Sequence, residues 1–359
     1  MTEPPADFVV IGSTPMARLL AGLLAGAHER RVIHVGESQS GYRLPRGIDL
    51  SVAPVTRPET WQLLREGTDE TRRLLGRIAG RGGWHHADPV FFADGPEGQE
   101  ALAHMRQLAL AFGLAAEKVA PSLLGQGREG TLLRDAIVLN RPVIEPALDS
   151  WLDRQGVLRL RPDAITIAMD GETTLALPED GTVHAQQAIL ADDAAIMAFL
   201  PVRQWPPLLR RQTSATILTA PTRPIAAPIM VQVDSGTTLN QQAEGGIAAW
   251  GPGDLAHFSG RLHGLLGAER AIEQAGQSAY QLLAPLDGAP AVGRAAGSGA
   301  DIVAGFGALG SFLAPALARW LTGTASTQEA DWFGARLATR GRADSTVGDY
   351  AAPARSAAA

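Results

Sequence analysis

The hydrophobic pattern near the start of the chain predicts a strand, a tight turn, a helix and a second strand. Residues 8–11 (FVVI) form a short apolar run, which is typical of a strand buried on both faces. Gly12 interrupts this run, and residues 17–27 then place leucines at helical spacing. A second apolar run, Val32–Val35, is followed closely by an acid, Glu37. In such a βαβ unit, a dinucleotide's diphosphate lies at the helix N-terminus and the acid accepts hydrogen bonds from a ribose.

The turn of this unit carries a reduced form of the G-x-G-x-x-G pattern. It reads GSTPMA, so that only its first glycine, Gly12, is present, while Ala17 at the third position still allows close packing. Thr14 fills the second position, where its hydroxyl can donate to a phosphate oxygen. Pro15 suits a first helical turn but removes one backbone amide. The alternative is a βαβ unit that binds nothing.

Downstream, the pattern changes from mixed helices and strands to a β-rich region. It predicts helices at 60–78, 98–114, 145–155, 255–266 and 269–283, strands at 90–93 and 136–139, an antiparallel meander within 157–190, and four short strands within 215–250. Near the C-terminus, a strand at 302–304, a glycine-rich turn from Gly305 to Gly310 and a helix at 311–321 form a second strand–turn–helix unit. Ser311 lies near the cap of that helix.

Composition and charge exclude several classes of function. The 359 residues are 45% hydrophobic and carry a net charge of −6, which argues against a nucleic-acid partner. The absence of cysteine excludes disulfides and thiolate metal sites. No apolar run reaches the roughly 18–20 residues of a membrane span, and the acidic N-terminus is unlike a signal peptide. We therefore expect a cytoplasmic protein. His85 and His86 lack a nearby third ligand, so no metal site is predicted.

Taken in order, these features resemble the D-amino-acid-oxidase-like FAD-dependent family, which includes glycine oxidase and sarcosine oxidase. The matching pieces are VVIGSTPMA with Glu37, the stretch DGAPAVG at 287–293, and GFGALGSFLAPALARWLTG from Gly305. The resemblance implies an α/β fold with a Rossmann-like FAD-binding domain and an inserted antiparallel β-sheet substrate domain, as in two-domain flavoproteins of the glutathione-reductase type. It implies an FAD-binding domain at 1–80, 140–205 and 285–338, a substrate domain at 81–139 and 206–284, and a flexible tail at 339–359.

The resemblance also implies roles for individual residues around a non-covalent FAD. Gly12, Thr14, Pro15 and Met16 would lie at the diphosphate, Glu37 at the ribose and Ile165 at the adenine. The flavin ring and ribityl chain would lie near Gly305, Gly307, Leu309, Gly310 and Ser311. The loop containing Ser38, Ser40, Gly41 and Tyr42 would approach the isoalloxazine, and Tyr42 is the one candidate for a catalytic side chain.

Two departures from the family pattern leave the function open. Asp192 and Asp193 replace small residues beside the dinucleotide, so they either point to solvent or weaken cofactor binding by charge repulsion. The β-rich region also lacks an obvious Arg/Tyr pair for a substrate carboxylate. The leading hypothesis is an FAD-dependent oxidoreductase acting on a C–N bond of a small amine or amino acid. The alternatives are a non-catalytic or subunit-type member that works with a partner subunit, and an NAD(P)-dependent enzyme.

Overall fold

The structure, a computed structural model, describes residues 5–37, 43–170, 172–177, 181–267, 270 and 272–340. Ser38, Ser40, Gly41 and Tyr42, for which the sequence predicts a place near the flavin, lie outside the described residues. The predicted tail lies outside them from residue 341 onward. Arg340, at the start of that tail, pairs with Asp287, with 2.8 Å between Nε and Oδ2. None of the helices in the described ranges is both long and apolar enough to span a bilayer.

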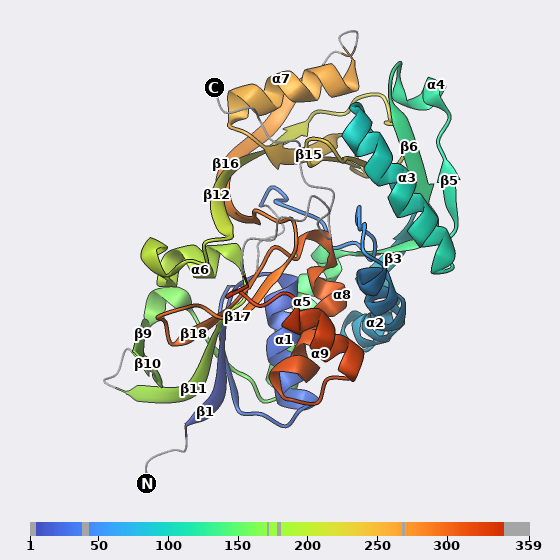
Figure 1. Ribbon diagram of the computed structural model, residues 1–359. Coiled ribbons are helices and arrows are strands. Elements are labelled where there is room, and N and C mark those ends of the chain that lie inside the picture. Colours follow the sequence, from blue (N-terminus) through green and yellow to red (C-terminus); the bar gives the residue numbers. More distant parts are fainter. Residues whose placement is uncertain are drawn as a thin grey trace.

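The first of two large sheets contains the predicted βαβ unit (Figure 1). Its main path runs β17 (Ala291–Arg294), β18 (Ala300–Ala304), β11 (Thr182–Leu190), β1 (Ala6–Ile11), β2 (Val32–Val35) and β8 (Leu158–Leu160). The strands from β18 to β8 are parallel to their neighbours, and β17 is antiparallel to β18. The predicted meander is confirmed for β9 (Thr166–Asp170), β10 (Glu172–Ala176) and β11, which pair antiparallel in turn. Its first segment, β8, instead pairs parallel with β2.

A layer of helices lies on one face of this sheet (Figure 1). They are α1 (Pro15–Gly26), α2 (Pro58–Ala79), α5 (Arg141–Arg154), α8 (Gly310–Leu321) and α9 (Thr327–Gly334). The apolar side of α1, with Leu19, Leu20 and Leu24, is fully buried among them. Because α1 and α8 pack against each other, the two glycine turns that precede them are brought to the same edge of the sheet.

The second sheet joins segments that are far apart in the sequence. Its order is β16 (Gln274–Pro285), β12 (Leu209–Thr219), β15 (Ile247–Pro252), β14 (Thr237–Gln241), β13 (Ile229–Gln232), β4 (Val90–Ala93), β6 (Glu129–Leu133) and β5 (Ala116–Lys118). It lies above the first sheet in Figure 1, with α7 (Leu255–Leu266) across its top. The remaining elements are a small ladder of β3 (Trp84–Ala87) with β7 (Ala136–Leu139) and the helices α3 (Pro96–Ala111), α4 (Pro121–Leu124) and α6 (Asp193–Phe199).

The prediction of a helix at residues 269–283 is wrong. Residues Gln274–Pro285 form β16, which pairs antiparallel with β12 from Leu209 opposite Pro285 to Thr219 opposite Gln274. The segment is rich in Ala, Gln and Leu, which favour helices. Its exposed and partly buried positions nevertheless alternate along most of its length, as in a strand at the edge of a sheet. Pairing with β12 therefore decides its conformation against the local preference.

Gly22 of α1 provides a test of the packing between α1 and α5. A Cβ at this position would lie 2.2 Å from Cζ3 of Trp151 in α5. We expect Gly22→Ala to lower the free energy of unfolding by about 1–3 kcal/mol because of overpacking. This loss should appear even though alanine favours a helix by roughly 1 kcal/mol over glycine.

The matched control is Gly76→Ala in α2, where a Cβ meets no atom within 4 Å. We expect this variant to gain up to about 1 kcal/mol. Denaturant titrations of both variants measure the two changes. A similar gain in both would contradict the packing described for α1 and α5.

Candidate functional site

The first glycine turn leads from the end of β1 into α1. Gly12 has a φ of +156°, and its amide donates to the Val35 carbonyl at 2.9 Å. Thr14 is the N-cap of α1, and its Oγ1 accepts a hydrogen bond from the Ala17 amide at 3.3 Å. Pro15 occupies the first helical turn, as predicted, and has no amide to offer. The Ala17 amide is thus already bonded within the helix, with the Thr14 hydroxyl oxygen as its acceptor.

Asp192 places a carboxylate directly on this turn. Its Oδ2 accepts a hydrogen bond from the Ser13 amide at 2.7 Å. Its Oδ1 accepts one from the Ala195 amide at 2.8 Å, which makes Asp192 the N-cap of α6. A Cβ on Gly12 would lie only 2.9 Å from Oδ2, so this position has no room for a side chain. Of the two orientations left open by the sequence, Asp192 takes the one facing the turn.

Asp193 points to the second sheet instead. Its Oδ2 accepts a hydrogen bond from the Leu283 amide of β16 at 3.1 Å. Burial raises the pKa of Asp193 to about 6, against the lowering effect of the Leu283 bond, and the nearby Asp192 charge adds to the rise. The two adjacent acids therefore connect the first glycine turn, α6 and the second sheet.

The second glycine turn packs against the first. A Cβ on Gly310 would lie 2.7 Å from Sδ of Met16, which measures how closely the two turns approach. Gly305 has a φ of +74°, and a Cβ there would lie 2.3 Å from Cγ of Pro285. Gly307 also has a positive φ, of +51°, and is exposed, whereas Leu309 is buried. The structure thus brings together Met16, predicted at the diphosphate, and Gly310, predicted near the flavin ring and ribityl chain of the same cofactor.

The Ser311 hydroxyl is committed to an internal contact. It donates to Oδ1 of Asp49 at 2.6 Å, and Asp49 Oδ2 pairs with Arg141 at 2.8 Å. Ser311 is fully buried. Any contact of Ser311 with a ligand would therefore come from its backbone.

The segment after residue 43 lies against the second sheet. Thr216 Oγ1 of β12 donates to the Pro45 carbonyl at 2.6 Å, and the Tyr280 hydroxyl of β16 donates to the Arg46 carbonyl at 3.3 Å. The Arg46 guanidinium carbon lies 5.0 Å from the centre of the Tyr280 ring. Burial raises the pKa of Tyr280, so the phenol remains a donor. The β-rich region has no Arg/Tyr pair of its own in the sequence, but the fold forms one with a loop arginine.

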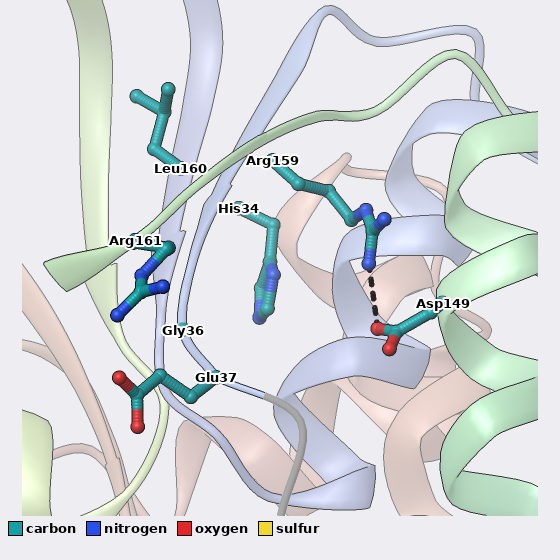
Figure 2. Close-up of a pocket in the computed structure, with 7 residues that line it drawn as sticks. All are labelled: His34, Gly36, Glu37, Asp149, Arg159, Leu160 and Arg161. Carbon is teal, nitrogen blue, oxygen red and sulfur yellow. Dashed lines mark ion pairs between the residues drawn. The ribbon is translucent and has the colours of Figure 1, made fainter. Parts of the chain in front are cut away.

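A pocket of about 390 Å³ opens beside the ends of β2 and β8 (Figure 2). It is lined by His34, Gly36, Glu37, Asp149, Arg159, Leu160 and Arg161. Arg159 pairs with Asp149 at 2.7 Å. Glu37 is exposed and extends away from the His34 ring toward the side of Arg161 (Figure 2), and its amide donates to Oγ of Ser13 at 3.0 Å. Ile165, by contrast, packs beside the core of the first sheet, just before β9.

His34 is buried below the first turn. Its Nε2 lies 2.8 Å from the Gly12 carbonyl, which can only accept, so we assign the imidazole proton to Nε2. Burial lowers the pKa of His34 to about 4, and the ring is therefore neutral at pH 7. Its Nδ1 has no hydrogen-bond partner among the described residues. A Cβ on Gly36 would lie 2.3 Å from the Gly12 carbonyl oxygen, so position 36 has no room for a side chain.

Solved structures of amino-acid-oxidising enzymes resemble the chain over most of its length. The glycine oxidase from Geobacillus kaustophilus matches with a TM-score of 0.66 and 14% identity, over 90% of this chain and 95% of that one. The L-proline dehydrogenase from P. horikoshii matches with a TM-score of 0.69 and 16% identity, over 92% and 96%. NikD, an unusual amino acid oxidase essential for nikkomycin biosynthesis, matches in its open form with a TM-score of 0.68 and 16% identity, over 90% and 95%.

The chain has the D-amino-acid-oxidase-like fold. At this low identity the comparisons show the fold, with its Rossmann-like sheet and its second sheet. No family model and no curated protein sequence matches the chain.

The D-amino-acid-oxidase-like fold implies FAD, and the residues at the turn do not fit its diphosphate in this conformation. The Ser13 amide is occupied by Asp192, the Ala17 amide by Thr14, and Pro15 has none. A phosphate placed here would also meet the Asp192 carboxylate, and like charges at such a distance repel. The nucleoside half fits better, because the pocket beside β2 is large enough and polar. The predicted cofactor site therefore fits the nucleoside half of FAD better than it fits the diphosphate.

Asp193 predicts a pH dependence of stability. Its pKa in the folded chain, about 6, lies above the ordinary value of 3.8, so the folded state binds more protons than the unfolded state between these values. Its contribution to stability is therefore greatest below pH 4 and is lost as the pH rises through 6, by at most about 3 kcal/mol. We expect Asp193→Asn to remove this part of the pH dependence.

Urea titrations of both proteins from pH 4 to pH 7.5 measure this effect. The wild-type free energy of unfolding should fall relative to Asp193→Asn as the pH rises. A constant difference across this range would show that Asp193 titrates normally. The matched control is Asp163→Asn, because this acid is exposed and its ion-pair partner, Arg161, is exposed as well.

Proposed function

We propose that the chain is a flavin-dependent oxidoreductase that oxidises a C–N bond of a small amine or amino acid, with FAD bound non-covalently. The observation that carries this proposal is the match of at least 90% of the chain to a glycine oxidase, a proline dehydrogenase and an amino acid oxidase. In such enzymes the flavin supplies hydride acceptance, while the protein supplies orientation and a dry pocket. We further propose that the enzyme is cytoplasmic and keeps the domain division inferred from its sequence.

Arg46 and Tyr280 favour an amino acid over a simple amine as the substrate. Arg46 is exposed and charged, and it lies over the Tyr280 ring on the second sheet. A guanidinium can bind a carboxylate through two parallel hydrogen bonds. A neutral phenol beside it can donate a third bond after it releases the Arg46 carbonyl. We therefore assign the substrate carboxylate to this pair.

The absorbance spectrum of the purified protein tests the cofactor. It should show a flavin band, or acquire one on incubation with FAD, and release FAD on denaturation. Anaerobic mixing with small amino acids, N-methyl amino acids and imino acids should then bleach that band. A protein that takes up no FAD under any condition would overturn the proposal.

Arg46→Gln tests the substrate assignment. We expect KM for an amino-acid substrate to rise at least about tenfold, the scale of a lost hydrogen bond to a charged group. The KM of an amine that lacks a carboxylate should stay unchanged. Arg43→Gln is the matched control, since Arg43 is exposed in the same segment. Equal effects of Arg46→Gln on both substrates would place the carboxylate elsewhere.

Asp192 favours a second candidate function, a non-catalytic or subunit-type family member that acts within a larger complex. Two amides of the turn, those of Ser13 and Ala17, already donate to side chains of the protein and need no ligand as a hydrogen-bond partner. For this candidate we expect a stable protein without flavin that copurifies with a partner subunit from its source. Flavin bleaching by any member of the substrate panel would decide for the enzyme.

A further inference from the structure

The first helix turn of a βαβ unit attracts anions because its backbone amides point outward and unpaired. In this chain an anion from the protein itself is already present. The Asp192 carboxylate accepts from the Ser13 amide at 2.7 Å, and its Oδ2 lies 2.9 Å from the position that a Gly12 Cβ would take. It therefore occupies one amide of the turn in the manner of a bound phosphate.

The position of Asp192 is fixed by more than this one bond. Its second oxygen caps α6 through the Ala195 amide at 2.8 Å. The next residue, Asp193, bonds the Leu283 amide of β16 at 3.1 Å. Because α6 begins between these contacts, Asp192 cannot leave the turn by rotating freely. Its departure strains either the α6 cap or the bond from Asp193 to the second sheet.

We propose that Asp192 is a specificity-determining residue that closes the diphosphate position of the first turn, so that a dinucleotide binds only by displacing its carboxylate. This inference rests on the proposed function in one respect, the dinucleotide class of the ligand. The inference adds that the Asp192 carboxylate opposes binding of a diphosphate at the turn. It does not affect binding of a nucleoside in the pocket near His34. Displacement also loosens the contact between Asp193 and β16, which couples the turn to the second sheet.

Titration calorimetry with ADP and adenosine tests the closure without using flavin or activity. Asp192→Asn removes the charge, and asparagine caps a helix as well as aspartate does. We expect ADP to bind this variant at least about tenfold more tightly than the wild type, because two unit charges near 4 Å repel by several times RT. Adenosine, which has no phosphate, should bind both proteins equally.

Salt dependence gives a second readout with a definite sign. Raising the ionic strength screens the repulsion between Asp192 and the diphosphate, so the ratio of the wild-type to the variant dissociation constant for ADP should fall. Asp254→Asn is the matched control. Asp254 caps α7 through the His257 amide at 2.9 Å, on the far side of the second sheet (Figure 1), and this change should not alter ADP binding.

Amide hydrogen exchange measures the coupling between the first turn and the second sheet. ADP should increase exchange at the Leu283 amide in the wild type and leave it protected in Asp192→Asn, where the ligand enters without displacing α6. If Asp192→Asn fails to fold, Asp192→Ser keeps a capping hydroxyl and removes the charge. Equal ADP affinity in the wild type and a folded neutral variant would overturn the proposal.

These outcomes separate the closure from the proposed function. Tight FAD binding that neutral variants do not improve would overturn the closure and leave the oxidoreductase in place. Improved ADP binding in Asp192→Asn, with no flavin reduction by any substrate, would support the closure and count against the oxidoreductase.

Discussion

A single carboxylate joins the starts of two helices in this protein. Asp192 accepts from the turn before α1 and from the first turn of α6, and Asp193 extends the connection to β16. The N-termini of helices carry partial positive charge, so one anion stabilises both ends and offsets the cost of placing a charge inside the fold. The arrangement of the first turn relative to the second sheet depends on this contact.

The same contact explains why the predicted cofactor site fits a nucleoside better than a diphosphate. A conventional turn keeps its amides for a diphosphate and places an acid at the end of the second strand. Here Glu37 still follows the second strand and lines the nucleoside pocket together with the neutral imidazole of His34, but a further acid, Asp192, lies at the diphosphate end. Negative charge is therefore present in both halves of the site. The family likeness extends over the fold, and the departure is confined to the residues that would meet a phosphate.

The sequence predicted the βαβ unit because its strands are short apolar runs and its helix has leucines at regular spacing, both of which are local patterns. It did not predict β16, where pairing with β12 overrides the helix preference of Ala, Gln and Leu. It identified Asp192 and Asp193 as unusual but could not orient them, because their partners, Ser13 and Leu283, lie 179 and 90 residues away. The pairing of Arg46 with Tyr280 depends on the same kind of distant contact.

The acid at the turn bears on how the chain can exist without a ligand. In a conventional turn the unpaired amides gain their partners only when the cofactor binds, so binding completes the fold. Here Asp192 and Thr14 already accept hydrogen bonds from the Ser13 and Ala17 amides, and the packing of Met16 against Gly310 holds the second turn beside the first. A ligand then competes with the protein's own hydrogen bonds, and only its differential affinity can open the turn. Stability without cofactor and affinity for cofactor are therefore opposed at Asp192, because the bond that it accepts from the Ser13 amide in the free chain is one that a diphosphate would replace.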